Sequence, residues 1–493
     1  MYLSVTNFIE NGIGKIEKYV SLCLQGQAEF GELSNKIHEE VNTMERQLIS
    51  DLYEAIDAEI YQSIARKKNW TVERKAESKE LLDISGTIRY NRTGYRDKRT
   101  GKYIYLLDEI LGIESHQRIS IAAEAQMLEE ATMSSYRRGG MRASEYESAS
   151  KQTVKRLVHE TILEMPQETP KEKRKVRYLH IIADEDHVAA QFQQIKGDLP
   201  RDSHGNKINT LMPKLICLYE DIVDEASERS KKHRYRLVGK HYFSGTGGGS
   251  EGNEELWREV DRYIKAVYDE DAIEKIYIAG DGAGWIKKGC EILGSHSRFY
   301  LDKFHMMKYV NTSVTHLGEE AEEKKAEIWR CLNGGHKREL NAIYKEIMRR
   351  TESESKQGEI INAQKYFMNQ WDGIMCRIEE QGSCWRCSAE GQISHVYSDR
   401  MSSRPMGWSE LGCSQMAKLR AYKWNDGKII DILKYQKKAE RKIKQEEREA
   451  LMHELDGRHA ERRSEEVLYA RIPGLENHSM KWLKSIINQA FSA

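Results

Sequence analysis

Proline, cysteine and long apolar runs are all scarce in this chain of 493 residues. Six prolines are too few for a proline-rich stalk or scaffold. No run approaches the ~20 consecutive apolar residues of a membrane-spanning helix, so we expect no membrane protein. The N-terminus lacks a basic start, a long apolar stretch and a small-residue cleavage site, which argues against secretion. The eight scattered cysteines favour a reduced, cytoplasmic interior over a disulfide framework.

The chain also has no excess of charge of either sign. Lys+Arg and Asp+Glu both number 78, so the chain is no simple polycation, and any nucleic-acid binding must come from local clusters. Hydrophobic residues make up 39%, which is enough for folded domains. At roughly 150 residues per domain, two to four domains are expected.

Residues 1–80 are predicted to be helical. Between Phe30 and Lys67 apolar side chains recur near helical spacing, among them Ile37, Val41 and Leu48. Such a helix either packs on its own domain or pairs with a second copy, and the pattern leaves both open.

Residues 83–106 change to a β-prone pattern with turn signals at Arg92–Gly94 and Thr100–Gly101. Six basic residues and one acid lie between positions 89 and 102, interleaved with three tyrosines. The basic residues are Arg89, Arg92, Arg96, Lys98, Arg99 and Lys102. This composition suits a hairpin that grips a phosphate backbone, although an ordinary solvated hairpin has a similar one.

Helical patterns return at Ile121–Met133 and Ala149–Val158, on either side of a short segment that contains Gly139 and Gly140. Five basic residues accompany them: Arg137, Arg138, Lys151, Lys155 and Arg156. The arrangement predicts a helix-turn-helix, although many small helical bundles look alike. We therefore assign residues 81–165 to a DNA-binding region, and the polar segment 166–176 to a boundary.

An α/β pattern follows in residues 176–305. The expected elements are strands Tyr178–Gln193, Lys214–Asp224 and Tyr235–Phe243, helix Asn253–Tyr268, and strands Lys275–Ala279 and Arg298–Leu301. Residues 306–380 are predicted to be an all-helical insertion, 381–430 a second part of the core, and 431–493 a basic helical tail. The order of three strands, helix, strand and helix is that of the mixed-sheet ribonuclease-H-like fold.

Three acids occupy suggestive places in this pattern. Asp184 lies inside the first strand, Asp281 ends the KIYIA strand, and Glu390 follows the helical insertion. A carboxylate in an apolar strand is costly unless it is paired or bound to metal. Two carboxylates about 4 Å apart repel by roughly 4 kcal/mol, which a divalent cation removes. Ligation by oxygen atoms alone favours two hard ions, Mg²⁺ or Mn²⁺, which in such a pair catalyse phosphoryl transfer. Taken singly, each acid also fits the role of a turn former or a helix cap.

The segments TGYRDKRTGKYIYLLDE, ADEDHV, IAGDGAGWIKKG, LDKFH and CSAEGQISHVYSDRMSSRPMGWS together resemble bacterial insertion-sequence transposases of the ISLre type. That family was long catalogued as an uncharacterised protein family, and the similarity runs from about residue 80 to 430. The resemblance implies a DDE transposase whose ribonuclease-H-like core is interrupted by a helical insertion, as in Mutator-like elements. By motif, Asp184, Asp281 and Glu390 match the catalytic triad of that family.

Further residues are candidates next to these ligands. Asp186 lies two residues from Asp184 and is predicted to share its face of the strand. The resemblance places Asp302 and His305 beside the site, and His395 follows Glu390 by five residues. Asp184 ranks first as the metal ligand of this strand, and Asp186 remains the alternative or a supporting acid beside it. For His305 and His395, a purely structural role stays open.

Outside that acidic set, Arg400 and Arg404 are candidate phosphate contacts, because guanidinium groups bind phosphate in a bidentate manner. Cys384 and Cys387 form one CxxC pair, which alone is a weak zinc signal. For the two arginines, too, a purely structural role stays open.

Together with this resemblance, which implies transposition, the sequence predicts an enzyme that binds double-stranded DNA at element ends and cuts and joins phosphodiesters with two Mg²⁺ ions. We expect a bacterial, nucleoid-associated cytoplasmic protein, and an oligomer, most simply a dimer, because two DNA ends must be held together. Two alternatives remain: a ribonuclease-H-like nuclease without strand transfer, and a non-catalytic DNA-binding derivative of a transposase.

Overall fold

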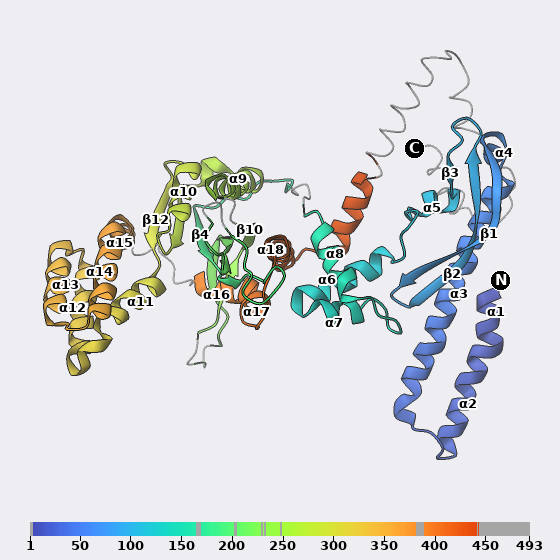
Figure 1. The fold of residues 1–493 in the computed structure, drawn as a ribbon, viewed down its shortest axis with the longest axis horizontal. Coiled ribbons are helices and arrows are strands. Elements are labelled where there is room, and N and C mark those ends of the chain that lie inside the picture. The colour runs from blue at the N-terminus through green and yellow to red at the C-terminus, as the bar shows by residue number, and fades with distance from the viewer. Residues whose placement is uncertain are drawn as a thin grey trace, which may run out of the picture. The chain divides into compact units, whose positions relative to one another are not determined.

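The computed structural model describes residues 3–163, 169–201, 205–227, 230, 233–246, 249–380, 389–440 and 442 (Figure 1). The chain divides into two compact units, one made of residues 1–160 and 429–493 and the other of residues 161–428. Each unit has a hydrophobic core of its own.

Helices open the first unit. They are α1 (Leu3–Asn7), the π-helix η1 (Phe8–Gly12), α2 (Ile13–Leu24), the 3-10 turn η2 (Phe30–Glu32), α3 (Leu33–Gln62) and α4 (Ile64–Asn69). The amphipathic helix predicted after Phe30 is confirmed by α3. Its Ile56 and Ile60 are buried with Ile88 and Tyr90 of the following sheet, so the apolar stripe packs within the unit.

A three-stranded antiparallel sheet follows, made of β1 (Trp70–Asp83), β2 (Gly86–Asp97) and β3 (Tyr103–Ile104). The prediction that residues 1–80 are all helical is wrong from Trp70 onward. The predicted turn at Arg92–Gly94 is also wrong, because β2 runs straight through it, whereas the turn at Thr100–Gly101 lies between β2 and β3. The charged sequence of β1 forms a strand because it pairs along β2, which is a tertiary rather than a local preference.

The first unit continues with four helices, namely α5 (Leu106–Leu111), α6 (Ile121–Met133), α7 (Tyr136–Met141) and α8 (Lys151–Glu160). The last three pack on one another, as the sequence predicted. Gly139 and Gly140 are buried there, and a Cβ atom on Gly140 would collide with the carbonyl oxygen of Ala149. Residues 429–440 form a further helix that joins this unit through an ion pair between Lys437 and Glu124 of α6.

The second unit is built on a mixed five-stranded sheet in the order β10-β7-β4-β11-β12. Its strands are β4 (Tyr178–Glu185), β7 (Pro213–Tyr219), β10 (His241–Thr246), β11 (Lys275–Gly280) and β12 (Ser297–Leu301). The first three strands of this order pair antiparallel, and β4, β11 and β12 pair parallel. The prediction of a mixed α/β unit is confirmed, and the three longer strands predicted before residue 244 each break into two elements.

The extra elements are two short ribbons. One pairs β5 (Val188–Ala189) with β6 (Thr210–Leu211), and the other pairs β8 (Asp221–Asp224) with β9 (Tyr235–Val238).

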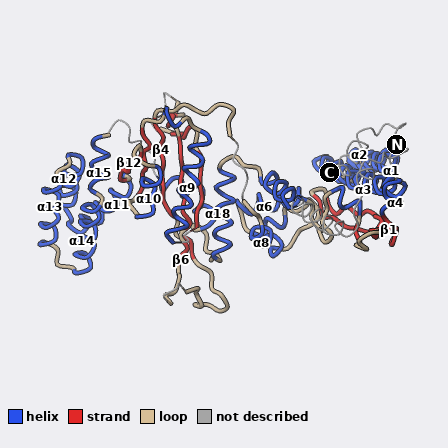
Figure 2. Tube along the Cα trace, turned by 90° about the horizontal axis from the view of Figure 1, so that it is seen from above, coloured by secondary structure: helices blue, strands red, loops and turns tan. Residues whose placement is uncertain are grey.

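Helices cover both faces of the large sheet. On one face lie α9 (Gly249–Val267) and α10 (Gly284–Leu293) (Figure 2). They bury Trp257 and Ile286 against the strands. On the other face lie α16 (Ala389–Ile393), the π-helix η5 (Ser394–Ser398), α17 (Asp399–Met401) and α18 (Glu410–Trp424). Figure 1 labels α9 and α16 on opposite sides of β4.

A helical bundle stands between β12 and α16 in the chain. It consists of α11 (Lys303–Val314), η4 (Thr315–Glu320), α12 (Ala321–Gly334), α13 (Lys337–Arg350), α14 (Glu354–Asn369) and α15 (Trp371–Glu379). These helices enclose a second apolar cluster that includes Ile328, Tyr344 and Phe367. The predicted all-helical insertion is therefore confirmed.

Candidate active site

Three aspartates lie in one row at the edge where the parallel strands end. The register pairs Ile182 with Ala279 and Gly280 with Leu301, and its continuation past these residues places Asp184, Asp281 and Asp302 side by side. The backbone N–H of Asp302 donates to the carbonyl oxygen of Gly280 at 3.0 Å, which holds this end of the row. Neighbouring strands are about 4.8 Å apart, so each aspartate is close to the next.

Asp184 is buried near the end of β4, with 9% of its surface exposed. Its Oδ1 accepts a hydrogen bond of 2.9 Å from the Glu185 N–H, and it forms no ion pair in the part of the chain that the structure describes. The pKa of Asp184 is raised from 3.8 to about 6, chiefly by burial and to a smaller extent by the charges of Asp281 and Glu390. The hydrogen bond from Glu185 and the charge of His305 oppose this rise. Its ionised form is thus costly, and a bound cation would stabilise it.

Asp281 lies in the loop between β11 and α10. Its Oδ1 accepts a hydrogen bond of 2.8 Å from the Ala283 N–H, which closes the turn and leaves Oδ2 for other ligands. Gly282 has φ +91°, a conformation that side chains other than glycine rarely adopt, so the turn requires glycine here.

Asp302 and His305 form a pair at the start of α11. Asp302 is 6% exposed, and its Oδ2 lies 3.3 Å from Nδ1 of His305. Burial lowers the pKa of His305, but the hydrogen bond with Asp302 and the charges of Asp184, Asp302 and Asp281 outweigh it, so the pKa is raised overall. The charged form of the partly buried His305 ring is thereby favoured beside the row, and in that form the ring can bind an anionic oxygen.

Glu390 reaches this face of the sheet from α16. That helix contacts β4, and its Gln392 accepts a hydrogen bond of 2.6 Å from Tyr242 of β10. Glu390 is exposed, and its charge raises the pKa of Asp184, which places it within electrostatic range of the row. Residues 381–388, which contain the predicted Cys384–Cys387 pair, lie outside the described residues.

The predicted metal site fits this arrangement in its chemistry. Asp184, Asp281, Glu390 and Asp302 offer only carboxylate oxygens, the ligands that Mg²⁺ prefers, and Asp184 is a buried carboxylate that repels two of the others. Within the described ranges, no three His, Cys, Asp or Glu side chains come close enough together to hold a metal ion. The acids thus line the edge of the sheet without forming a closed coordination site.

Asp186 and His395 lie in different surroundings from the row. Strand β4 ends at Glu185, and the side chain of Asp186 accepts a hydrogen bond of 2.9 Å from Ser402, just after α17. The exposed His395 has its ring 6.3 Å from that of Trp424.

The basic residues of β2 are largely paired with acids of their own unit. Arg92 is 5% exposed, forms an ion pair with the buried Asp108, and stacks on Tyr105 at 3.5 Å, so its prediction as a DNA contact is wrong. Arg89 and Arg96 are exposed but bind Glu80 and Glu73 of β1. Lys98, Arg99 and Lys102 are exposed. Pairing with β1 therefore removes much of the positive charge that the predicted hairpin carried in isolation.

The remaining predicted DNA contacts lie in both units. Arg137, Arg138, Lys151 and Arg156 are exposed on α7 and α8, and Lys155 is half-buried. The connection between these helices, residues 142–150, is longer than the three or four residues of a typical helix-turn-helix.

In the second unit Arg400 is 1% exposed, with its guanidinium 4.9 Å from the ring of Trp408. A buried guanidinium cannot meet a DNA phosphate, so the prediction for Arg400 is wrong. Arg404 is half-buried.

Two residues that the sequence did not single out contact the row. Tyr366 of α14 donates a hydrogen bond of 2.8 Å to the carbonyl oxygen of Asp281, and Gln370 donates one of 3.1 Å to that of Gly282. Their separation of more than eighty residues from Asp281 leaves no local signal for this contact.

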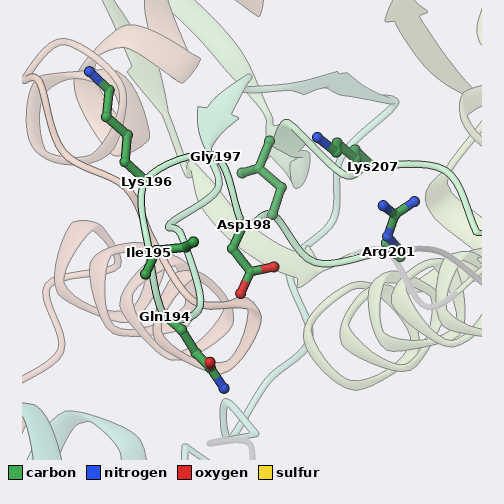
Figure 3. Close-up of a pocket in the computed structure, with 8 residues that line it drawn as sticks. Gln194, Ile195, Lys196, Gly197, Asp198, Arg201 and Lys207 are labelled. Atoms are coloured by element: carbon green, nitrogen blue, oxygen red, sulfur yellow. The ribbon is translucent and has the colours of Figure 1, made fainter.

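A surface hollow of about 410 Å³ lies elsewhere in the unit, in the connection between β5 and β6 (Figure 3). Lys196, Asp198, Arg201 and Lys207 line it. None of the predicted site residues lines this hollow, so it is separate from the acidic row.

Among the described helices, none combines the length and the apolar character needed to span a bilayer.

Comparison with known proteins shows what this chain is similar to. The model of the uncharacterised protein family UPF0236 matches residues 24–439. A UPF0236 protein of Caldanaerobacter subterraneus subsp. tengcongensis is 35% identical over 429 residues, which is 86% of each chain. A second from the same organism is 36% identical over 402 residues, covering 81% of this chain and 79% of the relative.

Proposed function

The chain belongs to the uncharacterised protein family UPF0236, and we propose from its acidic row that it is a DNA transposase of the insertion-sequence type. The observation that carries the proposal is the alignment of Asp184 and Asp281 at the ends of adjacent parallel strands, with Glu390 in electrostatic range. The strand order and orientations are those expected of a ribonuclease-H-like core interrupted by a helical insertion.

In this proposal Asp184, Asp281 and Glu390 hold two divalent ions. When bound there, Mg²⁺ supplies activation of the attacking oxygen and neutralisation of the leaving one. The chain itself contributes placement: the strand ends set the spacing of the acids, and the His305 imidazolium offers an N–H to a phosphate oxygen. Phosphoryl transfer depends on positioning and charge neutralisation, so no nucleophilic side chain is needed.

The reaction has two chemical steps. Water attacks the phosphorus at the element end, the bond between phosphorus and the 3′-oxygen breaks, and the released oxygen takes up a proton. The 3′-hydroxyl then attacks a target phosphodiester, loses its proton, and displaces the 3′-oxygen of the target strand. Two element ends require two such sites, so we propose a homo-oligomer, most simply a dimer, acting on DNA in the bacterial cytoplasm.

Exposed basic residues of the first unit are proposed to bind the element ends. Arg99, Lys102, Arg137 and Lys151 are exposed there and carry the positive charge that a DNA backbone attracts. Phosphate contacts of this kind supply affinity that falls with salt but little sequence preference.

The test is metal-dependent cleavage of DNA carrying element ends. Asp184→Ala, Asp281→Ala and Glu390→Ala should each abolish cleavage and keep most DNA binding. Glu255→Ala is the matched control, because Glu255 is an exposed acid of α9 that pairs with Arg262. Cleavage by all three variants would overturn the site assignment.

A strand-transfer assay distinguishes the transposase from the nuclease and from the non-catalytic derivative. Incubated with precleaved ends that carry a 3′-hydroxyl, a transposase yields strand-transfer product. Cleavage without joined product identifies a nuclease, and DNA binding that is indifferent to Asp281→Ala, with no cleavage by wild type, identifies a non-catalytic derivative.

A further inference from the structure

The helical insertion contacts the loop that carries Asp281. Near the C-terminal end of α14, the Tyr366 hydroxyl donates to the Asp281 carbonyl oxygen at 2.8 Å, and one turn later Gln370 donates to the Gly282 carbonyl oxygen at 3.1 Å. Two successive peptide groups of the loop are therefore held by one helix.

The Tyr366 hydroxyl is itself held rigidly. Its ring stacks on Tyr309 of α11 with centroids 3.9 Å apart and planes 21° from parallel. Helix α11 begins directly after Asp302, so it is anchored to the end of β12. The neighbouring Phe367 is fully buried in the core of the bundle, which fixes α14 as a whole. The hydroxyl is thus placed by two helices and not by a mobile side chain.

The loop and α14 pack without a gap. A Cβ atom on Gly282 would overlap the side-chain amide of Gln370. Contact with Gln370 therefore limits movement of the loop toward the helix, and rotation of either carbonyl group would break the hydrogen bond that it accepts. On the other side of the same turn, Asp281 Oδ1 is bound to the Ala283 N–H, so carboxylate and carbonyl of Asp281 are fixed together.

We propose that Tyr366 and Gln370 are positioning residues, through which the insertion fixes the Asp281 carboxylate in the orientation that binds metal. This inference rests on the proposed function, since it assigns the insertion a role in the same site. A loop released from α14 samples other orientations, and metal binding must then restore the bound one. Loss of one such hydrogen bond is expected to weaken metal binding roughly fivefold.

The experiment compares Tyr366→Phe with Tyr344→Phe in the full-length protein. Both variants remove one tyrosine hydroxyl from the same bundle. Among the described residues, the Tyr344 hydroxyl forms a hydrogen bond only with the Ser313 hydroxyl, at 3.2 Å, and none with the loop. Phenylalanine keeps the ring of Tyr366 on Tyr309. The first readout is hydrogen–deuterium exchange of the peptide spanning residues 280–286 without metal. The second is Mn²⁺ affinity measured by electron paramagnetic resonance.

Tyr366→Phe should speed exchange of this peptide and weaken Mn²⁺ binding about fivefold, and Tyr344→Phe should change neither. Unchanged exchange, or faster exchange with unchanged Mn²⁺ affinity, overturns the positioning role. Equal effects of both variants overturn it too, because the change then reflects general loosening of the bundle. A wild type that binds no Mn²⁺ instead refutes the proposed metal site itself, which separates the two failures.

Discussion

Replacing Asp184 by asparagine should stabilise the metal-free protein above neutral pH. The carboxyl is 9% exposed, and burial is the main reason that its pKa rises from 3.8 to about 6. Between these two values the folded protein holds the proton more tightly than the unfolded chain does. The contribution of this group to stability is therefore fully present below pH 3.8 and is lost as pH rises through about 6.

The size of this loss follows from the shift. At about 1.4 kcal/mol for each pKa unit, a rise of two units costs the folded protein about 3 kcal/mol above pH 6. Asparagine has the same shape without the charge, so Asp184→Asn should recover most of this free energy at pH 8 and very little at pH 4.

Thermal unfolding in EDTA at pH 4.5 and pH 8 measures the effect. Tryptophan fluorescence is the appropriate signal, because most of the tryptophans lie in the unit of residues 161–428. Asp221→Asn is the control, since Asp221 is exposed on β8. Adding Mg²⁺ at 100 times its dissociation constant should stabilise wild type by about 2.7 kcal/mol and leave Asp184→Asn unchanged.

The reasoning is refuted if Asp184→Asn is no more stable than wild type at pH 8 in EDTA. It is equally refuted if the difference between the two proteins is the same at both pH values, because the gain then does not come from the charge.

Three further predictions concern other parts of the chain. Arg92→Ala should destabilise the first unit by about 3 kcal/mol, because it leaves the buried Asp108 carboxylate without its partner. Arg99→Ala should instead lower DNA affinity without changing the unfolding temperature. Unfolding curves and DNA titrations of both variants test this, and the reverse pattern would contradict it. His305 has a raised pKa, so the stability that its charge contributes is present below the unfolded value of about 6.5 and is lost as pH rises through the higher folded pKa; the stability difference between wild type and His305→Gln should shrink toward pH 9, and a constant difference would speak against it. Gly140→Ala should destabilise the first unit by about 1–3 kcal/mol through the clash of the added Cβ with the neighbouring backbone, and unaltered denaturant unfolding would show that α7 and α8 separate easily.

Much of the candidate site could be predicted because its signals are local. The strands that carry Asp184 and Asp281 are short apolar runs that end at polar residues, and the helices after Lys303 follow a clear 3.6-residue period. Which side chains surround a given residue in the fold, and whether it is buried, could not be predicted in the same way. Arg92 and Arg400 carry the same charge as Arg99 in the sequence, yet the fold buries the first two.

By itself, then, the sequence determined the order of the main strands and helices between residues 176 and 380, the placing of acids at strand ends, and the presence of a helical bundle before Glu390. Each of these features depends on neighbours along the chain. Only the tertiary structure decided that β1 is a strand, that its acids pair with Arg89 and Arg96 of β2, and that α14 holds the Asp281 loop. These features depend on burial and pairing between segments distant in sequence, and such contacts exist only once the chain has folded.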